Sequence, residues 1–324
     1  MGKWWSLLFG VVMLACLALF VMAPSHGWWL PPGMSTHSED VDFLFYIILY
    51  ITGFFFILTE AILIVFMFKY AGHPGPAKAA PSTGPNIFQK MFPFLRDQHH
   101  VEMAWTVVPA AILLYIAFAQ VPAWLRIKDR SKTPTFGGKQ VPIQVEVSAR
   151  QFEWHVRYPS SERLERWMKN EGKEDFKSFG VFHNGQPKYK QIDDVPAVNE
   201  IHLWKGQTIL VHLNTLDVIH SFNIPFMRVK QDALPGKTIP VWFTPTHANT
   251  RFDEKSQRWV DGINMETGEP DRKFYRWEIA CAELCGWGHH RMIGRIYVHE
   301  TQDDFFKWLK KTEVENLSHG KASK

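Results

Sequence analysis

The chain has 324 residues, of which 46% are apolar and 21% charged, and its 36 Lys and Arg residues against 32 Asp and Glu residues leave a formal net charge of +4. This composition excludes a disordered chain, gives no support for a nucleic-acid partner and, with three cysteines, excludes a disulfide-stapled scaffold. The long apolar runs all lie before residue 125, so the sequence predicts a membrane anchor followed by a water-soluble domain.

The first apolar run covers residues 4–23 and follows a single basic residue, Lys3. Its length fits either a signal peptide or a retained membrane span, so residues 1–24 are predicted as a separate N-terminal apolar segment. The residues before Cys16 weakly resemble a lipoprotein cleavage site. Cleavage, lipidation at Cys16 and retention as a third span therefore all stay open.

Two longer runs predict a transmembrane hairpin over residues 43–125. Residues 43–68 hold a single charge, Glu60, in 26 residues, which exceeds the about 20 residues that cross a hydrocarbon core. Residues 103–125 are uncharged and carry Trp near both ends, as segments at a membrane interface do. A charged Glu60 facing lipid would be costly, so we expect its side chain to be neutral or paired within protein.

Charge sets the predicted orientation of the hairpin. Residues 69–100, between the two spans, carry four Lys or Arg residues, whereas residues 24–42 carry three acidic residues and no Lys or Arg. Basic loops stay on the cytoplasmic side of a membrane, so the 69–100 loop is predicted to be cytoplasmic. Everything after residue 125 is then predicted to lie outside.

From residue 139 to residue 300, short runs rich in β-branched and aromatic residues are separated by turn residues, and several alternate apolar with polar side chains. This pattern predicts an all-β domain, a sandwich or Greek-key barrel, that no long amphipathic helix interrupts. Two charged stretches without periodicity, residues 160–197 and 248–272, are predicted as surface insertions between strands. Residues 301–324 are predicted as a short C-terminal helix, which begins at Thr301, followed by a tail.

Potential metal ligands are concentrated in one short segment near the end of this domain, and one further histidine lies well upstream. The candidates are Cys281, Cys285, His289, Met292 and His220. This soft donor set suits copper, whereas structural zinc favours four Cys or His ligands and no Met. Two thiolates can bridge two copper ions, which then share one unpaired electron. Because no coordination position is left for a substrate, the segment is predicted to transfer electrons rather than to catalyse bond making.

Other interpretations of these residues stay open. A disulfide or a zinc site at Cys281 and Cys285 is one alternative, and His290 in place of the neighbouring His289 is another. His220, taken alone, has the character of an ordinary core histidine. The remaining histidines lack ligand spacing and are predicted to have surface or core roles; they include His99, His100, His202, His212, His247 and His299.

Together these motifs resemble subunit II of the haem-copper cytochrome c oxidases over residues 43–300. The resemblance rests on four segments, which are Cys281-x-Glu283-x-Cys285-Gly-x-x-His289-x-x-Met292, Asp217-Val-Ile-His220-Ser-Phe, residues 229–236 and Glu102-x-x-Trp105-Thr106-x-x-Pro109. The first segment is similar to the loop of the family's dinuclear copper centre, CuA. The resemblance implies a transmembrane helical hairpin, with or without a third N-terminal helix, that anchors an all-β cupredoxin-like sandwich.

The resemblance also implies which residues bind the metals. One copper would be bound by His220 and Met292, and the other by His289 and the backbone carbonyl of Glu283, with both cysteine sulfurs bridging. The Glu283 side chain would reach a Mg²⁺ ion at the contact with subunit I. Electrons would pass from a cytochrome c-type donor through this centre to the haem of subunit I, where oxygen is reduced and protons are pumped.

Glu102 matches the acidic residue that begins a proton-uptake pathway in the family; a carboxylate exposed to cytoplasmic water is the plainer alternative. The implied partners are subunit I with its haem and copper, subunit III and the electron donor of a respiratory chain. The implied location is the bacterial cytoplasmic membrane, with the copper domain on its periplasmic side. The sequence lacks a Cys-x-x-Cys-His motif after the copper loop, so the donor is expected to be a separate protein.

The sequence departs from the family pattern where electrons enter the subunit. The family shows Gln-Trp-x-Trp, whereas this chain has Phe152 in place of the first Trp and keeps Trp154. Strand alternation would put both side chains on one face of a strand, so we expect Phe152 to receive electrons with Trp154 packed below it. Trp287, inside the copper loop, is a third candidate or a shield against water.

Two rival functions remain at this point. A nitric oxide reductase subunit with a CuA site shares the copper loop, and the Glu102 motif favours the oxidase over it. A copper-free quinol oxidase subunit would use its β-domain structurally, and the intact ligand set argues against it. The identity of the donor and the haem types of the partner stay open.

Overall fold

The computed structural model describes residues 3–70, 98–128, 142–169, 194–256, 258–262, 267 and 277–322. The chain divides into two compact units, one made of Met1–Trp29 and Phe43–Trp124 and the other of Leu30–Asp42 and Leu125–Lys324. The first unit is helical, and the second holds every strand of the described residues.

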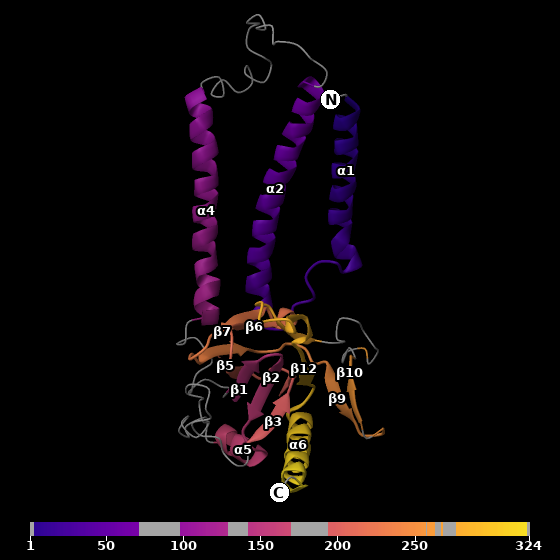
Figure 1. Ribbon diagram of the computed structural model, residues 1–324, viewed down its shortest axis with the longest axis vertical. Helices are drawn as coiled ribbons and strands as arrows, with labels where there is room; N and C mark the ends of the chain where they lie inside the picture. Colours follow the sequence, from indigo (N-terminus) through magenta and orange to yellow (C-terminus); the bar gives the residue numbers. More distant parts are fainter. Residues whose placement is uncertain are drawn as a thin grey trace, which may run out of the picture. The chain divides into compact units, whose positions relative to one another are not determined.

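The helical unit is built on α1 (Lys3–Met22), α2 (Ser38–Tyr70) and α4 (Gln98–Lys128), drawn in indigo to magenta in Figure 1. All three helices are long and apolar enough to cross a membrane. With 33 residues, α2 is about 50 Å long, more than the about 30 Å of a hydrocarbon core. The predicted hairpin is therefore confirmed, and α1 adds a third apolar helix.

Two details of these helices concern the prolines of α4 and the acidic residue of α2. Pro109 and Pro122 both lie inside α4, which continues through them. Glu60 lies on α2, and its buried Oε2 has no hydrogen-bond partner among the described residues, so the expected pairing is not seen there. Residues 71–97 of the predicted cytoplasmic loop lie outside the described residues.

Among the described residues of the second unit, twelve strands make up two sheets. One sheet has the order β3-β2-β1-β5-β8, and the other has the order β10-β9-β12-β11-β6-β7 with β4 paired to β12. The strands are β1 (Ile143–Arg150), β2 (Glu153–Tyr158), β3 (Val195–Val198), β4 (Glu200–Trp204), β5 (Ile209–Thr215), β6 (His220–Ile224), β7 (Val229–Ala233), β8 (Ile239–Phe243), β9 (Thr250–Asp253), β10 (Arg258–Asp261), β11 (Glu278–Cys281) and β12 (Ile293–His299).

Period-two burial shows why these segments form a sandwich. In β2, Trp154, Val156 and Tyr158 are fully buried, while the residues between them are partly exposed. Buried side chains from both sheets form one contiguous hydrophobic core. The predicted all-β cupredoxin-like sandwich is confirmed.

A short helix that the sequence analysis did not predict, α5 (Ser161–Lys169), lies in the first predicted insertion. It buries Leu164 and Trp167, three residues apart on one face. Two buried apolar side chains in a charged stretch are too few to show the helical hydrophobic period in the sequence. Residues 170–193 of the same insertion lie outside the described residues.

Strands also occur in both predicted insertions. β3 closes the first insertion and pairs with β2, and β9 and β10 form a hairpin in the second. The C-terminal helix α6 (Gln302–Ala322) is longer than predicted and is capped by the Thr301 hydroxyl, which accepts a hydrogen bond from the Asp304 N–H at 3.2 Å.

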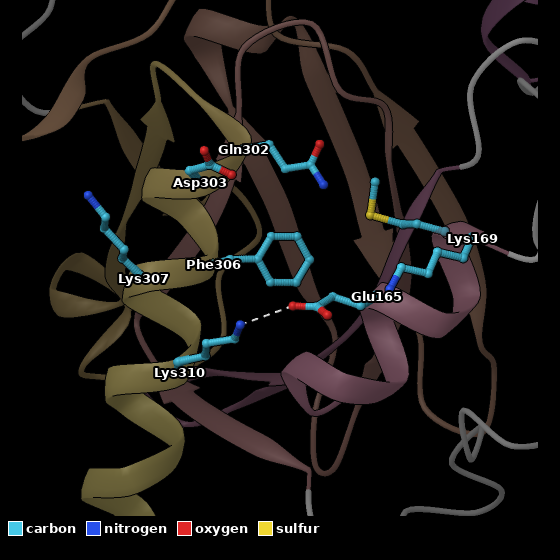
Figure 2. A pocket seen from close by; sticks show the side chains of 8 residues that line it. Glu165, Lys169, Gln302, Asp303, Phe306, Lys307 and Lys310 are labelled. Carbon is cyan, nitrogen blue, oxygen red and sulfur yellow. Dashed lines mark ion pairs between the residues drawn. The ribbon is translucent and has the colours of Figure 1, made fainter.

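Helices α5 and α6 pack beside each other at the end of the sandwich. Lys310 forms an ion pair with Glu165 at 3.0 Å, and both side chains line an open hollow of about 560 Å³ between the two helices (Figure 2). Met168 and Phe306 are the apolar residues that line it, and the rest of the lining is charged or polar.

Candidate metal centre

The predicted ligands are brought together where β6, β11 and β12 meet. Cys281 is the last residue of β11, and His220 is the first residue of the neighbouring strand β6. The Cys281 N–H donates to the Met292 carbonyl at 3.1 Å, which closes the loop between β11 and β12. The Ala282 N–H donates to the carbonyl of Ser221 on β6 at 3.0 Å, so the loop is also tied to the strand that carries His220.

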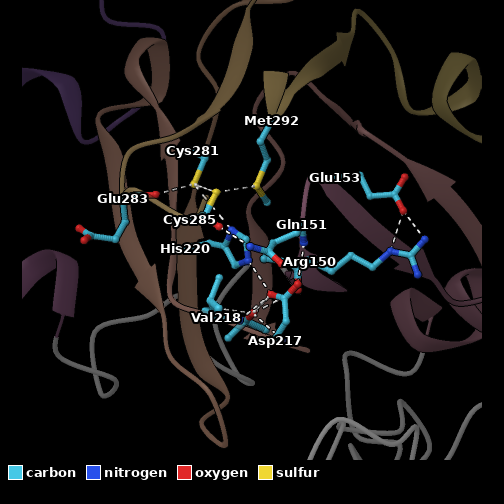
Figure 3. Close-up of polar contacts among 12 residues, drawn as sticks. Arg150, Gln151, Glu153, Asp217, Val218, His220, Cys281, Glu283, Cys285 and Met292 are labelled. Atoms are coloured by element: carbon cyan, nitrogen blue, oxygen red, sulfur yellow. Dashed lines mark hydrogen bonds and ion pairs between the residues drawn. The ribbon is translucent and has the colours of Figure 1, made fainter. Parts of the chain in front are cut away.

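The two thiols lie at the centre of the cluster, with their Sγ atoms 3.9 Å apart (Figure 3). Cys281 Sγ lies 3.8 Å from His220 Nδ1 and 3.2 Å from the backbone carbonyl of Glu283. Cys285 Sγ lies 3.5 Å from His289 Nδ1 and 3.9 Å from Met292 Sδ.

Each sulfur therefore contacts one member of each ligand pair that the resemblance implies. Cys281 touches His220 from one pair and the Glu283 carbonyl from the other, and Cys285 touches Met292 and His289 in the same way. This is the arrangement that two bridging sulfurs require. Both cysteines are free thiols in the structure, so the disulfide alternative is not realised.

Glycine is required in the loop because an aromatic ring lies against its backbone. A Cβ at Gly288 would lie 2.4 Å from the Cδ2 of Phe152, and Gly286 has a φ of +131°. The Gln151 amide donates to the Cys285 carbonyl at 2.5 Å. The turn between β1 and β2 therefore supports the loop from outside.

Asp217 orients the upstream histidine. Its carboxylate accepts hydrogen bonds from His220 Nε2 and from the Val218 N–H through Oδ1, and from the Gln151 N–H through Oδ2, each at 2.7 Å. Because Nε2 carries the donated proton, Nδ1 is the free ligand atom and faces Cys281. Burial opposes ionisation of Asp217, but these hydrogen bonds hold its pKa below the ordinary value.

The thiols are electrostatically unequal. Burial disfavours both thiolates, but the adjacent His220 side chain and a hydrogen bond from the Ser221 backbone lower the pKa of Cys281. Burial and the neighbouring Cys281 charge raise the pKa of Cys285. A cation between the sulfurs would remove this repulsion, so the donor set and its electrostatics fit a bound metal.

The structure separates the three aromatic candidates for electron input. Phe152 lies in the turn before β2, not in a strand, so the prediction that strand alternation aligns it with Trp154 is wrong: the chain turns at residues 151–152 and β2 begins at Glu153. Trp154 is 0% exposed and packs edge-on against the rings of His220 and Phe222. Trp287 is 79% exposed and meets the Phe152 ring at a centroid distance of 5.1 Å.

The remaining predicted residues lie apart from the thiols. The Glu283 side chain is exposed and points away from the sulfurs (Figure 3). Within the described ranges, the one group of three His, Cys or carboxylate ligand atoms within 4.8 Å of one another is His220, Cys281 and Cys285. His290 is exposed, with its ring 3.3 Å from Arg291. Glu102 lies near the start of α4, in the other unit.

Sequence reasoning did not identify Asp217 and Gln151 as residues that support the site. Asp217 had a sequence signal, because it stands three residues before His220 and Asp side chains commonly bond to nearby groups at that spacing. Gln151 had none, since its contact with Cys285 joins residues 134 positions apart.

The fold and the site define a class of protein: a membrane-anchored chain whose cupredoxin-like domain gathers two thiols, two imidazoles and a thioether at the ends of its strands. Residues 23–122 match the transmembrane domain of cytochrome c oxidase subunit II, and residues 143–264 match its periplasmic domain. The second match includes His220 and ends before Cys281. The chain belongs to the cytochrome c oxidase subunit II family.

Curated relatives match most of the chain. The "Alternative cytochrome c oxidase subunit 2" of Bradyrhizobium diazoefficiens is 25% identical over 89% of this chain and 84% of its own length. The cytochrome c oxidase subunit 2 of Thermostichus vulcanus is 24% identical over 96% of this chain and 85% of its own length. The crystal structure of the periplasmic domain of subunit II from Bradyrhizobium japonicum is 18% identical, covers 54% of this chain and 96% of that chain, and has a TM-score of 0.35. Electron transfer in a haem-copper oxidase is the general role of this family.

Proposed function

We propose that this chain receives electrons for a cytochrome c oxidase at a dinuclear copper centre, CuA. The observation that carries the proposal is the sulfur pair 3.9 Å apart, in which each sulfur contacts one member of each expected ligand pair. His220 and Met292 would hold one ion, and His289 and the Glu283 carbonyl the other. When bound, such a centre supplies a one-electron redox couple shared between two ions.

The protein's own residues prepare the site for this role. Asp217 holds His220 with Nδ1 toward the thiols, and the loop hydrogen bonds hold both cysteines on one side of the sandwich. Met292 and His220 are 0% exposed, so water is excluded from one side of the centre. A thioether in contact with a thiol favours copper over zinc, because zinc sites use Cys, His and carboxylate ligands.

The wider role extends to residues outside the copper centre. The proposed donor is a cytochrome c-type protein, and the acceptor is the haem of subunit I, in a complex that includes subunit III and lies in the bacterial inner membrane with the copper domain on the periplasmic side. The exposed Glu283 carboxylate supports a Mg²⁺ ligand role toward subunit I, because it is free to bond outside this chain. Glu102, near the start of α4, is proposed to take up protons on the cytoplasmic side.

The nitric oxide reductase subunit is the rival that shares the copper loop. The Glu102 motif supports the oxidase, because it implies proton uptake coupled to electron transfer. The copper-free quinol oxidase subunit is disfavoured by the gathered ligands. Oxygen and nitric oxide consumption by the purified complex would separate the first two functions.

Copper stoichiometry and electron paramagnetic resonance of the full chain test the metal assignment. We expect two copper ions per chain and a spectrum in which one unpaired electron is shared equally between two copper nuclei. One copper per chain, a spectrum of a single isolated copper, or preferential retention of zinc from an equimolar mixture would overturn the dinuclear assignment.

A further inference from the structure

Trp287 stands out on the surface of the loop that carries the thiols. Its side chain is 79% exposed, although burial of a Trp is strongly favourable, and it lies two residues from both Cys285 and His289. The guanidinium carbon of Arg291 lies 5.9 Å from its ring centroid, within the range of a cation–π contact. The ring is therefore presented to solvent by a loop whose other side faces the proposed copper centre.

A second aromatic ring, that of Phe152, lies between Trp287 and the backbone of the ligand loop. Phe152 meets Trp287 edge-on, with centroids 5.1 Å apart and planes at 68°. Its ring lies tightly against the backbone at Gly288 and Gly286, since a Cβ at either glycine would lie 3.3 Å or less from a ring carbon. These glycines are the immediate neighbours of Cys285 and His289, so two rings connect solvent to the ligand loop.

The two other aromatic candidates for electron input are less exposed than Trp287. Trp154 also contacts the site through the ring of His220, but it is fully buried and cannot meet a protein in solution. Phe152 is partly buried and packs edge-on against Trp287. Among the described aromatic residues beside the ligand loop, Trp287 offers the most exposed ring.

We infer that Trp287 is the docking contact and the electron-input residue for the soluble donor, with Phe152 as the positioning residue that supports its ring. The inference rests on the proposed function. In the step, the donor haem iron is oxidised from Fe(II) to Fe(III), the copper centre gains that one electron, and no bond or proton changes place. Electron transfer slows steeply with the gap between the two centres, so a ring that touches both the donor and the loop shortens the gap.

Trp is enriched among the interface residues whose truncation weakens binding most. The expected loss of donor affinity in a Trp287 variant is therefore large. With the copper-free full chain, Trp287→Ala should weaken binding of oxidised mitochondrial cytochrome c by about tenfold or more, as loss of a hot-spot side chain does. With the copper-loaded chain, the same change should slow reduction by reduced cytochrome c at least as much. Reduction by hexaammineruthenium(II), a small reductant that needs no docked complex, should keep its rate within a factor of two.

Leu284→Ala is the matched control, because Leu284 is 78% exposed in the same loop and makes no ring contact with Phe152 among the described contacts. It should leave cytochrome c binding and both reduction rates unchanged. Trp287→Phe, which keeps an aromatic ring over Phe152, should restore most of the rate. The copper spectrum should be identical in all three variants, which separates a docking role from a structural one.

The outcomes separate this inference from the function on which it rests. If the wild-type chain binds two coppers but Trp287→Ala binds and accepts electrons from cytochrome c as the wild type does, Trp287 is not the input residue. Equal losses in Trp287→Ala and Leu284→Ala would also overturn the inference. A wild-type chain without the shared-electron copper signal would overturn the proposed function itself.

Discussion

The imidazole of His220 donates its Nε2 proton to the carboxylate of Asp217 at a distance of 2.7 Å. The same carboxylate also holds the backbone of Gln151 and Val218, so it is fixed by the fold before any metal binds. The opposite ring nitrogen, Nδ1, is then held 3.8 Å from Cys281 Sγ. One acidic side chain thus sets both the tautomer and the direction of a ligand.

Asp217→Ala should lower copper affinity by about 10- to 100-fold, the usual loss when a residue that orients a metal-bound histidine is removed. Without this acceptor the tautomer and orientation of the imidazole would no longer be fixed, and the metal would have to order the ring on binding. Competition with a calibrated copper chelator measures the change. Asp303→Ala, which removes an exposed carboxylate on α6, serves as the control; equal affinities in the two variants would show that Asp217 does not orient the ligand.

Cys281→Ser and Cys285→Ser should each abolish the shared-electron copper spectrum, because a single thiolate cannot provide two bridges between the ions. Copper content and electron paramagnetic resonance of the full chain give the result. The chain supplies its own control in Cys16, which lies in α1 and takes no part in the centre. Cys16→Ser should keep both coppers, and a serine variant at the site that also keeps both would contradict the bridging arrangement.

Gly288→Ala should destabilise the β-domain by about 1–3 kcal/mol, as overpacking of a tight contact does. The new Cβ would lie 2.4 Å from Phe152 Cδ2, so the aromatic ring must move and its contact with Trp287 is disturbed. Denaturant unfolding measures the free energy. In the double variant Phe152→Ala with Gly288→Ala the clash is gone, so the two changes should be strongly non-additive; simple additivity would show that the ring is not the obstacle.

Acidification should destabilise the β-domain because it contains histidines that are buried in the neutral form. Burial lowers the pKa of His212 to about 4 and lowers the pKa values of His202 and His299 well below the ordinary value. Below about pH 6.5 the unfolded chain binds protons that the native chain does not, so the free energy of unfolding falls as the pH falls.

His212→Gln isolates one part of this pH effect. Urea unfolding at pH 7 and pH 5 should show a smaller loss of stability in the variant than in the wild type, by about 1–2 kcal/mol, because one histidine no longer titrates on unfolding. His247→Gln is the comparison, because this side chain is only partly buried and its Nδ1 lies 2.8 Å from the Thr246 hydroxyl. Its loss should leave the fall in stability between pH 7 and pH 5 unchanged. If the stability of His212→Gln and of the wild type depended identically on pH, protonation of His212 on unfolding would not contribute to the acid destabilisation.

Glu102→Gln in the assembled oxidase should slow steady-state oxygen consumption while leaving reduction of the copper centre by its donor unchanged. The proposed defect is in proton uptake, which lies on the opposite side of the membrane from electron input. Stopped-flow reduction and oxygen-electrode turnover measure the two steps separately. Glu39→Gln, at the start of α2, should change neither. Unaltered turnover of Glu102→Gln across the pH range would return Glu102 to the role of an exposed carboxylate.

Several features of this protein could be read directly from the order of residues. A membrane span is a property of one continuous apolar stretch, so the two spans of the hairpin were predicted without knowing what they contact. Four of the candidate ligands lie within twelve residues, and so short a loop can only bring them close together. Strand alternation predicted the sandwich for the same reason, because it is a local period.

Other features depend on contacts between residues far apart in the chain, which no local period encodes. His220 joins Cys281 only because β6 pairs with β11, and Phe152 meets Trp287 only because a turn outside the strands packs on the ligand loop. Helix α5 was missed because two apolar side chains in nine residues do not show a helical period. They are buried only in the folded protein, where α5 packs beside α6. Strand register and side-chain packing depend on many contacts between residues that are distant in the chain. A local sequence pattern describes one partner of such a contact and does not identify the other.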